Sequence, residues 1–464
     1  MTEGFFSGLL GWRSTTTKKT RKPGAPVRES DLICCIEPPA MDEWYDYNHT
    51  LQEDHGLVVA PSYKLTREAY SKLAIGYDHE SEFGGLSHVS TNSSPEFYDA
   101  QSEESKSSVR LNQHALASLD FAKNWTFIDS TDDYRVSYAH KKGGVPLTDI
   151  RIQNKIRESG SEILKSMGRK ILSGDFNLTT ISFPIKCMED KTVLHNTIKA
   201  MLMDSLYINR AALLKDPVER LRLVVISKIS CFIHTCTFLK PMNPILGETL
   251  YAHGPDGSEY YCEQTSHHPP VSHFLVIGPQ QRFTSSGYYV FEAKAGLNSL
   301  RINNMGKRRV QFQDGQTITF NCPNEYFTNS LIGTLKHEVE GPMIFLDEAN
   351  QLECIVTFGK VKGKPSDYVE GLIIRNGTTL ISKLSGTYLG WLEFDGRRYW
   401  DARHVTPNRV TFDVNLPSDS EVRSDLLALR QGNMEAAQRN KEDLENSQRH
   451  DRNLRTKHQR KQRK

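Results

Sequence analysis

The 464-residue chain has no long uninterrupted apolar run and almost no net charge. Its most apolar stretch, 221–239, is interrupted by Arg222, Lys228 and His234, which predicts a buried helix rather than a membrane span. A formal net charge of +2 provides no global field of the kind that nucleic-acid binders use. Electrostatic function must therefore come from local clusters of charge.

Cysteines are few, and catalytic signatures are missing. The eight cysteines contain no CxxC pair, which favours a reduced, intracellular chain. No G-x-S-x-G nucleophile elbow occurs, and no cofactor is expected. The apolar stretch 4–12 is too short for a secretory signal and follows Glu3 instead of a basic flank. The basic residues Lys18 and Lys19 follow it, so this stretch could bind an anionic membrane. The alternative is a disordered terminus.

Composition divides the chain into three regions. Residues 1–155 are rich in Ser, Thr, Asp and Glu, and we expect this region to be largely disordered because it buries too little apolar surface. An ordered domain is expected over 156–450, followed by a basic tail over 451–464. Apolar residues at helical spacing predict helices over 194–213 and 219–239, and an earlier amphipathic one. The apolar positions of that earlier helix are Ile163, Leu164, Met167, Ile171 and Leu172.

After Pro241 the chain consists of short β-rich runs separated by Gly, Pro, Asn and Asp. Many short strands with turn signals between them indicate an antiparallel meander, either a sandwich or a barrel. A single sheet of this many strands should curl or close. The predicted strands span 259–262, 274–277, 288–291, 299–302, 317–320, 332–335, 343–346, 352–358, 368–374 and 383–394.

Two neighbouring histidines, His267 and His268, directly precede two prolines. The prolines fix φ and restrict the residue before them, which stiffens the pair at a strand edge or turn. Imidazole donors suit phosphate oxygens near neutral pH. Two unrelated histidines on a turn are the plainer alternative. A zinc site with His273 is disfavoured, because no suitably spaced carboxylate or thiol accompanies the three histidines.

Two further segments contain cations that can meet an anion. Lys240 and Asn243 belong to the proline-stiffened segment KPMNPILGE, where lysine offers a point charge and asparagine a directional hydrogen bond. Lys441, Glu445 and Arg449 have i, i+4, i+8 spacing, which places them on one face of a helix. The alternatives are an ordinary helix-to-strand connection and an exposed helix with surface ion pairs.

Taken together, these segments resemble motifs of the oxysterol-binding-protein-related family. Residues 263–270, EQTSHHPP, resemble its fingerprint EQVSHHPP, with Thr265 in place of valine. Residues 240–248 resemble its KPxNPxLGE motif, and the spacing over 441–449 resembles its C-terminal KxxxExxxR helix. The resemblance covers roughly residue 162 to the C-terminus. No pleckstrin-homology domain is recognisable, so the chain looks like a short form of the family.

The resemblance implies a mainly β fold with helices: a large incomplete antiparallel β-barrel that encloses a lipid tunnel. Helical segments are expected before the barrel and at the C-terminus. An N-terminal lid is expected to cover the tunnel mouth and to shield the lipid tail from water. The residues assigned to the lid are Ile163, Leu164, Met167, Ile171 and Leu172.

The resemblance also implies that the protein binds phosphatidylinositol 4-phosphate and exchanges it between membranes for a sterol or phosphatidylserine. The histidine pair would hold the 4-phosphate near three cations, Glu445 would orient the two C-terminal cations, and Asn243 would contact the headgroup. One alternative is a phosphoinositide sensor or tether without net transport. Another is an enzyme with a histidine base, which is disfavoured because no acid/base pair accompanies the histidines. The implied headgroup residues are Lys240, Asn243, His267, His268, Lys441, Glu445 and Arg449.

A short acidic-aromatic segment lies in the N-terminal region. It resembles the FFAT motif EFFDAxE, with Tyr98 and Ser102 as departures, and a chance cluster is the alternative. An FFAT motif implies binding to VAMP-associated proteins of the endoplasmic reticulum. We therefore expect a cytoplasmic protein, peripherally associated with membranes at endoplasmic-reticulum contact sites. The residues of the FFAT-like motif are Glu96, Phe97, Tyr98, Asp99 and Ala100.

Overall fold

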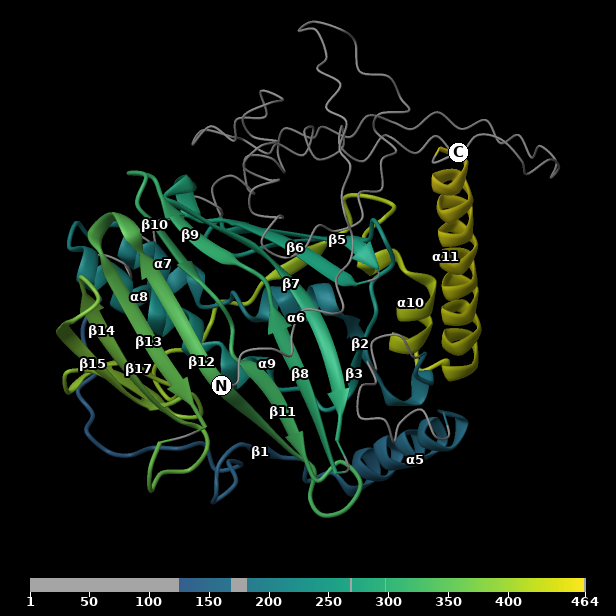
Figure 1. Ribbon diagram of the computed structural model, residues 1–464, viewed down its shortest axis with the longest axis horizontal. Coiled ribbons are helices and arrows are strands. Elements are labelled where there is room, and N and C mark those ends of the chain that lie inside the picture. Colours follow the sequence, from purple (N-terminus) through teal and green to yellow (C-terminus); the bar gives the residue numbers. More distant parts are fainter. Residues whose placement is uncertain (1–124, 168–181, 268, 297, 360, 463–464) are drawn as a thin grey trace, which may run out of the picture. The chain divides into compact units, whose positions relative to one another are not determined.

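The strands of this chain form one very large antiparallel sheet (Figure 1). The computed structural model describes residues 125–167, 182–267, 269–296, 298–359 and 361–462, and all structural statements concern these residues. In the described ranges, sixteen strands belong to the sheet, and β2 and β3 form a separate parallel pair. The strands are β1 (Val145–Pro146), β2 (Met188–Thr192), β3 (Lys240–Met242), β4 (Thr249–His253), β5 (Glu259–His267), β6 (Pro270–Ile277), β7 (Phe283–Ala295), β8 (Ser299–Met305), β9 (Arg308–Phe312), β10 (Thr317–Phe320), β11 (Asn324–Thr328), β12 (Lys336–Asp347), β13 (Leu352–Phe358), β14 (Tyr368–Arg375), β15 (Thr379–Thr387), β16 (Trp391–Phe394), β17 (Arg397–Asp401) and β18 (Thr411–Asp413).

Two long strands, β7 and β12, change partners along their length. The first half of β7 pairs with β9, ending at Gly287 opposite Arg308, and its second half pairs with β8. Similarly, β12 pairs with β11 in its first half, and in its second half it lies between β10 and β13. A twisted sheet of this size curls instead of staying flat. The predicted fold class, a mainly β chain built on an incomplete antiparallel barrel, is confirmed.

Helices come before and after the strands in the sequence, and those before β3 pack against the sheet. The main core joins inward side chains of the strands, such as Val310 and Phe312, to the helices before β3. Among these helices α8 is buried on nearly all sides and lies behind the sheet in Figure 1. It begins at Pro217, and the Asp216 side chain accepts a hydrogen bond from the backbone N–H of Val218 at 3.0 Å. The helices are α5 (Ile150–Met167), α6 (Val193–Lys199), α7 (Asp204–Ala212), α8 (Pro217–Ser230), α9 (Phe232–Thr235), α10 (Ser424–Arg430) and α11 (Met434–Gln462).

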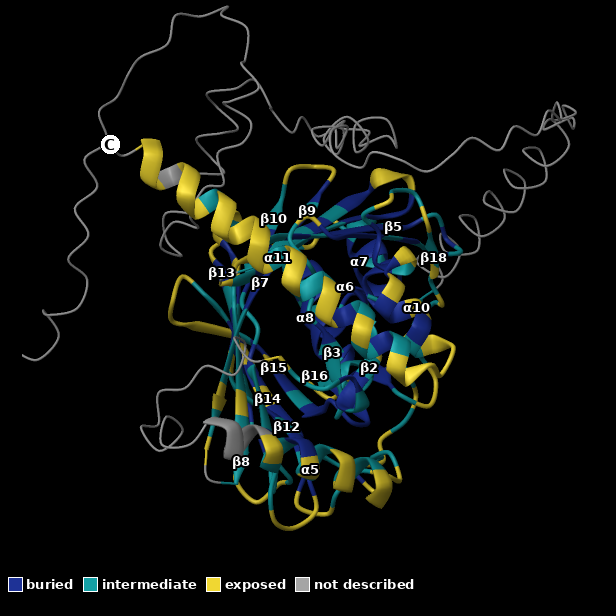
Figure 2. Cartoon of the chain, turned by 90° about the vertical axis from the view of Figure 1, so that its right-hand side faces the viewer, coloured by how far each residue is buried: buried dark blue, intermediate teal, exposed yellow. Residues whose placement is uncertain are grey.

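The last helix, α11, runs alongside the body and is exposed over most of its length (Figure 2). Its inner side is anchored by Ala437, which packs with Leu426 of α10, Met188 and Met242. Helix α11 therefore shares one small apolar cluster with α10 and the β2–β3 pair. None of the helices in the described ranges combines the length and apolarity needed to cross a bilayer.

The described structure begins well before Ile156, where the sequence predicts order to begin. The side chain of Trp125 packs against the main core. The Arg135 side chain donates from Nε to the buried carboxylate of Asp367 at 2.9 Å. The boundary expected at residue 155 is therefore too late, because short polar segments such as this one gain order from distant partners on the sheet.

Other element predictions also need correction. The helix expected over 194–213 is broken into α6 and α7, and the one expected over 219–239 ends at Ser230 and is followed by the short α9. The strand expected over 332–335 is not formed: these residues belong to the loop before β12, where Ile332 is 78% exposed. That loop contacts α5, whose Gln153 side chain accepts a hydrogen bond from the backbone N–H of Leu335.

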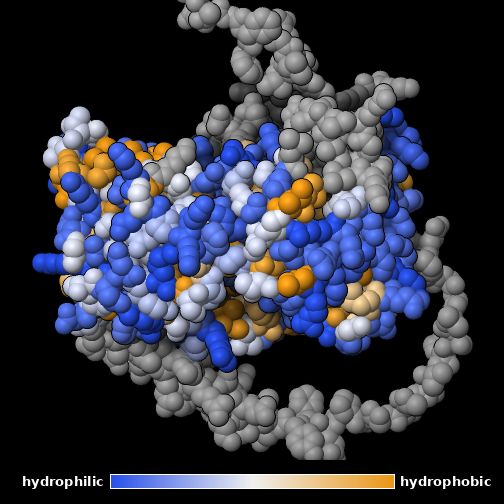
Figure 3. All heavy atoms as spheres, turned by 90° about the horizontal axis from the view of Figure 1, so that it is seen from below, coloured by the Kyte–Doolittle hydropathy of each residue, from blue (hydrophilic) through white to orange (hydrophobic). Residues whose placement is uncertain are grey.

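Helix α5 and the loop before β12 lie at the bottom of Figure 1, and Figure 3 shows the molecule from that side. Hydrophobic atoms gather around a hollow near the middle of this face. Two side chains of these elements, Ile150 and Ile332, are strongly exposed apolar groups. This face therefore offers apolar contact as well as the usual polar surface.

Candidate functional site

The segment KPMNPILGE forms β3 and then a loop that leads to β4. Its first residues, 240–242, lie in parallel register with β2, so that Met188 pairs with Lys240. Gly247 has φ of +80°, a conformation that side chains rarely adopt, and the loop turns there. The buried Glu248 carboxylate accepts a hydrogen bond from the backbone N–H of Ile245 at 2.9 Å, so the loop is closed by its own last residue.

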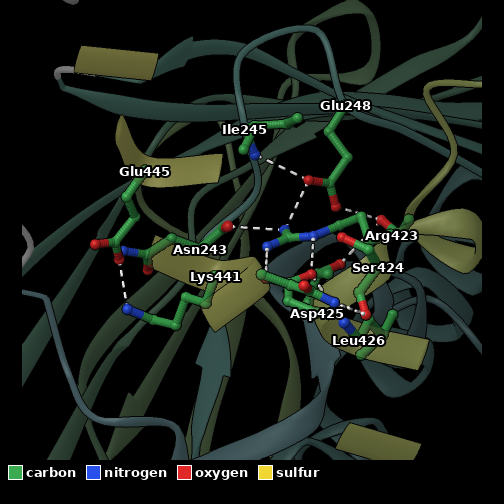
Figure 4. Close-up of polar contacts among 12 residues, drawn as sticks. Asn243, Ile245, Glu248, Arg423, Ser424, Asp425, Leu426, Lys441 and Glu445 are labelled. Atoms are coloured by element: carbon green, nitrogen blue, oxygen red, sulfur yellow. Dashed lines mark hydrogen bonds and ion pairs between the residues drawn. The ribbon is translucent and has the colours of Figure 1, made fainter. Parts of the chain in front are cut away.

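Arg423 fixes this loop to the C-terminal part of the chain (Figure 4). Its Nη1 donates to Glu248 at 2.8 Å and to the backbone carbonyl of Asn243 at 2.9 Å. Its Nε and Nη2 donate to Asp425 at 3.0 and 2.7 Å. Burial raises the pKa of Glu248, and the Arg423 charge opposes that shift. We call Glu248, Arg423 and Asp425 the buried triad; its charges are paired within the protein.

Helix α11 presents the second group of predicted residues. Lys441 is 4% exposed and forms an ion pair with Glu445, one helical turn later. Arg449 Nη2 donates to the same carboxylate at 3.1 Å while its side chain stays exposed. The i, i+4, i+8 spacing thus places two cations on either side of one carboxylate, as the sequence predicts.

Lys240 and Asn243 reach the same region from the loop. Lys240 Nζ donates to Asn243 Oδ1 at 2.5 Å and lies 5.5 Å from the ring centre of Phe183. Burial, with the neighbouring Lys441 charge, lowers the pKa of Lys240 to about 8, although Glu445 opposes that shift. The loop lysine and the helix lysine are therefore close enough to repel each other.

The histidine pair lies at the end of β5, beside the same helix. His267 Nδ1 lies 3.4 Å from Nε2 of Gln448 on α11. In the sheet, His267 pairs with Pro270 of β6. His268 lies outside the described residues. His273, considered above for zinc, lies on β6 with Nδ1 2.8 Å from the Thr265 hydroxyl, and burial lowers its pKa to about 4. The described residues contain no group of three or more side chains suited to a metal ion.

Three residues at the site were not predicted. The Ser182 hydroxyl accepts a hydrogen bond from Lys441 Nζ at 2.7 Å and donates to Glu445 at 3.0 Å. Gln448 and Phe183 contact His267 and Lys240, respectively. No sequence signal identifies these three residues, because each one contacts a partner that is distant in the chain.

We call Lys240, Lys441, Glu445 and Arg449 the cation cluster. It holds three cations and one carboxylate, so positive charge is in excess. Two of the cations are shielded from water, which strengthens their attraction for an anion. The cluster can bind a multiply charged anion through charge-assisted hydrogen bonds. It contains no evident nucleophile or acid/base pair.

The remaining predicted residues cannot be placed in the site. Ile163, Leu164 and Met167 belong to the last turns of α5, but their side chains lie outside the described residues, as do Ile171 and Leu172. The whole FFAT-like segment, 96–102, also lies outside them. The lid and the FFAT-like motif therefore stay predictions.

Known families and structures resemble this chain. A family model described as Oxysterol-binding protein matches residues 163–405. Oxysterol-binding protein 9 of Dictyostelium discoideum is 31% identical over 344 residues, which covers 68% of this chain and 80% of that protein. Oxysterol-binding protein-related protein 7 of Homo sapiens is 26% identical over 302 residues, which covers 59% of this chain and 36% of that protein.

Two solved structures share the fold. The Osh1 ORD domain in complex with cholesterol matches with a TM-score of 0.56 and 20% identity, covering 75% of this chain and 89% of that domain. The Osh3 ORD of Saccharomyces cerevisiae in complex with PI(4)P matches with a TM-score of 0.52 and 20% identity, covering 70% of this chain and 89% of that chain. At this level of identity the likeness concerns the fold.

Proposed function

The chain belongs to the oxysterol-binding protein family, a family of lipid-binding and lipid-transfer proteins and not of enzymes, and we propose that it binds phosphatidylinositol 4-phosphate. The headgroup would be held by the cation cluster together with His267, His268 and Asn243. The complex of Osh3 with PI(4)P, which has the same fold, supports this ligand.

The observation that carries the proposal is the meeting of distant motifs at α11. Lys441 and Arg449 of α11 both pair with Glu445, and the charges of Lys441 and Glu445 act on Lys240 of β3. His267 of β5 lies 3.4 Å from Gln448 of the same helix. Three cations against one carboxylate suit a phosphorylated inositol ring. A neutral headgroup would leave the repulsion between Lys240 and Lys441 uncompensated.

The lipid tail would lie against the inward face of the sheet. Burial of each CH₂ group contributes roughly 0.8 kcal/mol, so an acyl chain supplies most of the affinity while the head supplies selectivity. The lid predicted at the end of α5 would close over the tail. This arrangement would let the protein carry a lipid through water.

We further propose exchange of the phosphoinositide for a second lipid, a sterol or phosphatidylserine. The Osh1 complex with cholesterol shows that a neighbour of the same fold takes a sterol. The other candidate function is a phosphoinositide sensor or tether, which would use the same cation cluster but move no second lipid.

The site of action proposed for this exchange is the cytoplasmic surface of membranes at endoplasmic-reticulum contacts. The FFAT-like residues Glu96 to Ala100 would recruit VAMP-associated proteins, and the exposed Ile150 and Ile332 would touch the bilayer. Titration of a peptide spanning 96–102 against such a receptor domain tests the recruitment. Absence of saturable binding would remove it.

Lipid extraction from liposomes tests the headgroup assignment. The full chain should remove phosphatidylinositol 4-phosphate from vesicles, and the double variant His267→Ala/His268→Ala should extract none while melting at the same temperature. His404→Ala, at an exposed histidine of the described body, is the matched control. Full extraction by the double variant would refute the assignment. Transport of sterol or phosphatidylserine separates an exchanger from a sensor.

A further inference from the structure

Arg308, the first residue of β9, is a buried cation that leaves most of its hydrogen-bond donors unused. It is 2% exposed, and its Nη1 donates to the backbone carbonyl of Gly306 at 3.1 Å. Its Nε and Nη2 have no hydrogen-bond partner among the described residues. Removing a guanidinium from water without a partner is strongly unfavourable, so this side chain needs an explanation.

The other buried arginines in the described ranges have partners. Each lies within ion-pair or hydrogen-bond distance of a side-chain oxygen. The partners are Asp314 for Arg220, Asn209 for Arg282, Asp401 for Arg398 and Asp425 for Arg423, at 2.7, 2.6, 3.6 and 2.7 Å. The buried Lys228 is likewise paired, with Asp204 at 2.6 Å. Arg308 differs from these residues, because no carboxylate or side-chain amide oxygen of the described residues pairs with it and its side chain meets Tyr289 instead.

The surrounding strands leave space for this side chain. Gly287 pairs with Arg308 across β7 and β9, and a Cβ at Gly287 would lie 2.9 Å from Arg308 Cγ. The guanidinium carbon lies 4.0 Å from the ring centre of the buried Tyr289. Stacking on an aromatic face partly offsets lost hydration, and it leaves the N–H groups in the guanidinium plane available.

The two unused nitrogens suit one kind of ligand group. Nε and Nη2 lie on the same edge of the guanidinium, so their N–H bonds are parallel and match the two oxygens of a carboxylate or phosphate. A sterol hydroxyl presents a single oxygen and would satisfy only one of them. The geometry therefore favours an oxyanion over a hydroxyl.

Arg308 is separate from the headgroup site at α11. His267 of β5 pairs with Pro270 of β6, and the next residue of β6, Val271, pairs with Val290 of β7. Arg308 of β9 pairs with Gly287, which lies further back along β7. Four residues along the strands at about 3.4 Å each and three strand spacings of about 4.8 Å place the His267 and Arg308 backbones roughly 20 Å apart. A lipid whose head lies at α11 would therefore present its tail to Arg308.

We propose that Arg308 binds the oxyanion, a carboxylate or phosphodiester, of an acidic lipid held against the inward face of the sheet. This inference rests on the proposed function, in which that face holds lipids, and it specifies the second lipid as an anionic one instead of a sterol. Arg308 is then the residue that selects the cargo.

The test uses the full chain and vesicles of phosphatidylcholine that contain phosphatidylserine, oleate or cholesterol. Wild-type protein should extract phosphatidylserine or oleate in preference to cholesterol. Arg308→Met should reduce that extraction at least about tenfold, the effect of one lost charge-assisted contact. Extraction of phosphatidylinositol 4-phosphate should stay within about twofold, and Arg309→Met, which changes the exposed neighbour on β9, should alter neither.

Several outcomes would overturn the proposal. One is unchanged extraction of the acidic lipids by Arg308→Met, and another is equal extraction of cholesterol by wild-type protein. A third is stabilisation by inorganic phosphate through Arg308 with no acidic lipid extracted, which would assign the site to a free anion. If Arg308→Met fails to fold, Arg308→Lys keeps the charge without the parallel donors and should still lose extraction; wild-type extraction by Arg308→Lys would overturn the assignment.

The proposed function can fail independently. If wild-type protein extracts no phosphatidylinositol 4-phosphate, the headgroup assignment at α11 is lost, whereas Arg308-dependent extraction of phosphatidylserine or oleate would still support the interior site. Loss of both activities in a folded Arg308→Met variant would instead assign Arg308 a general role in lipid entry and refute its role in cargo selection.

Discussion

The buried triad and the cation cluster are attached to the same loop but balance their charges differently. The triad pairs Arg423 with the two carboxylates of Glu248 and Asp425, all of them buried. The cation cluster places Lys240, Lys441 and Arg449 around one carboxylate. One end of the loop is thus anchored by charges that the protein satisfies itself. The other end has cations left to be neutralised by a ligand.

The difference indicates which charges hold the fold and which serve binding. Breaking a buried pair leaves an uncompensated charge and is strongly destabilising. Removing one cation from a cluster with excess positive charge relieves repulsion, so stability is spared while anion affinity falls. The motif KPMNPILGE combines both roles: Glu248 at its end supports the fold, and Lys240 at its start is proposed to bind.

The largest expected effect is on the triad. Arg423→Leu leaves Glu248 and Asp425 buried without their cation and should lower the free energy of unfolding by about 3–5 kcal/mol. Chemical denaturation measures this change. Arg439→Leu on α11 removes an exposed pair with Glu435 and should cost less than about 0.5 kcal/mol. Equal losses of unfolding free energy in the two variants would contradict the role of the buried triad in stabilising the fold.

An intermediate effect is expected at the cation cluster. Lys441→Met should weaken binding of phosphatidylinositol 4-phosphate roughly 10- to 100-fold, since a hydrogen bond to a charged group contributes about 1.5–3 kcal/mol. The melting temperature should change little, because Glu445 keeps Arg449 as its partner. Titration with vesicles measures the affinity, and Lys457→Met, exposed further along α11, is the control. A variant that unfolds as Arg423→Leu does would place Lys441 with the fold-supporting charges.

The smallest effect concerns pH. The pKa of Lys240 is lowered to about 8 by burial and by Lys441, so the lysine loses its proton as pH rises through that value. Affinity for the phosphoinositide should fall by less than about tenfold between pH 7.5 and 9.5, where a phosphate monoester is already dianionic. Without lipid, the unfolded chain binds more protons between pH 8 and about 10.4, so stability should rise with pH in that window relative to Lys240→Met. Lys240→Arg should make the affinity insensitive to pH, and an unchanged slope in that variant would exclude Lys240 as the titrating group.

The sequence predicts the β-sheet well where apolar runs are continuous. The strands expected over 317–320 and 352–358 match β10 and β13. It does not predict β9 or β11, because polar residues such as Arg308 and Glu325 interrupt the apolar pattern of these short strands. The expected strand at 332–335 has β-type residues but lies in the loop before β12, and its Ile332 is exposed.

Motif spacing identifies the loop and helix residues of the candidate site, but not the contacts that join them. Lys441, Glu445 and Arg449 can be placed on one helix face from spacing alone. The role of Arg423 requires the fold, because nothing in its local sequence links it to Glu248. Arg308 also requires the fold, because only the burial of β9 turns an ordinary arginine into an unpaired interior charge.

Ser182 ties the start of the β2–β3 region to the cation cluster. Its hydroxyl accepts a hydrogen bond from Lys441 Nζ and donates one to Glu445. A phosphate that replaces Ser182 as the acceptor of a Lys441 N–H would break the first of these bonds. Loading the site would therefore loosen a tether at the segment that follows the predicted lid, and unloading would fasten it again. Ligand binding and anchoring of that segment would then be mutually exclusive, because the hydrogen bond from Lys441 to Ser182 is replaced by one to the ligand.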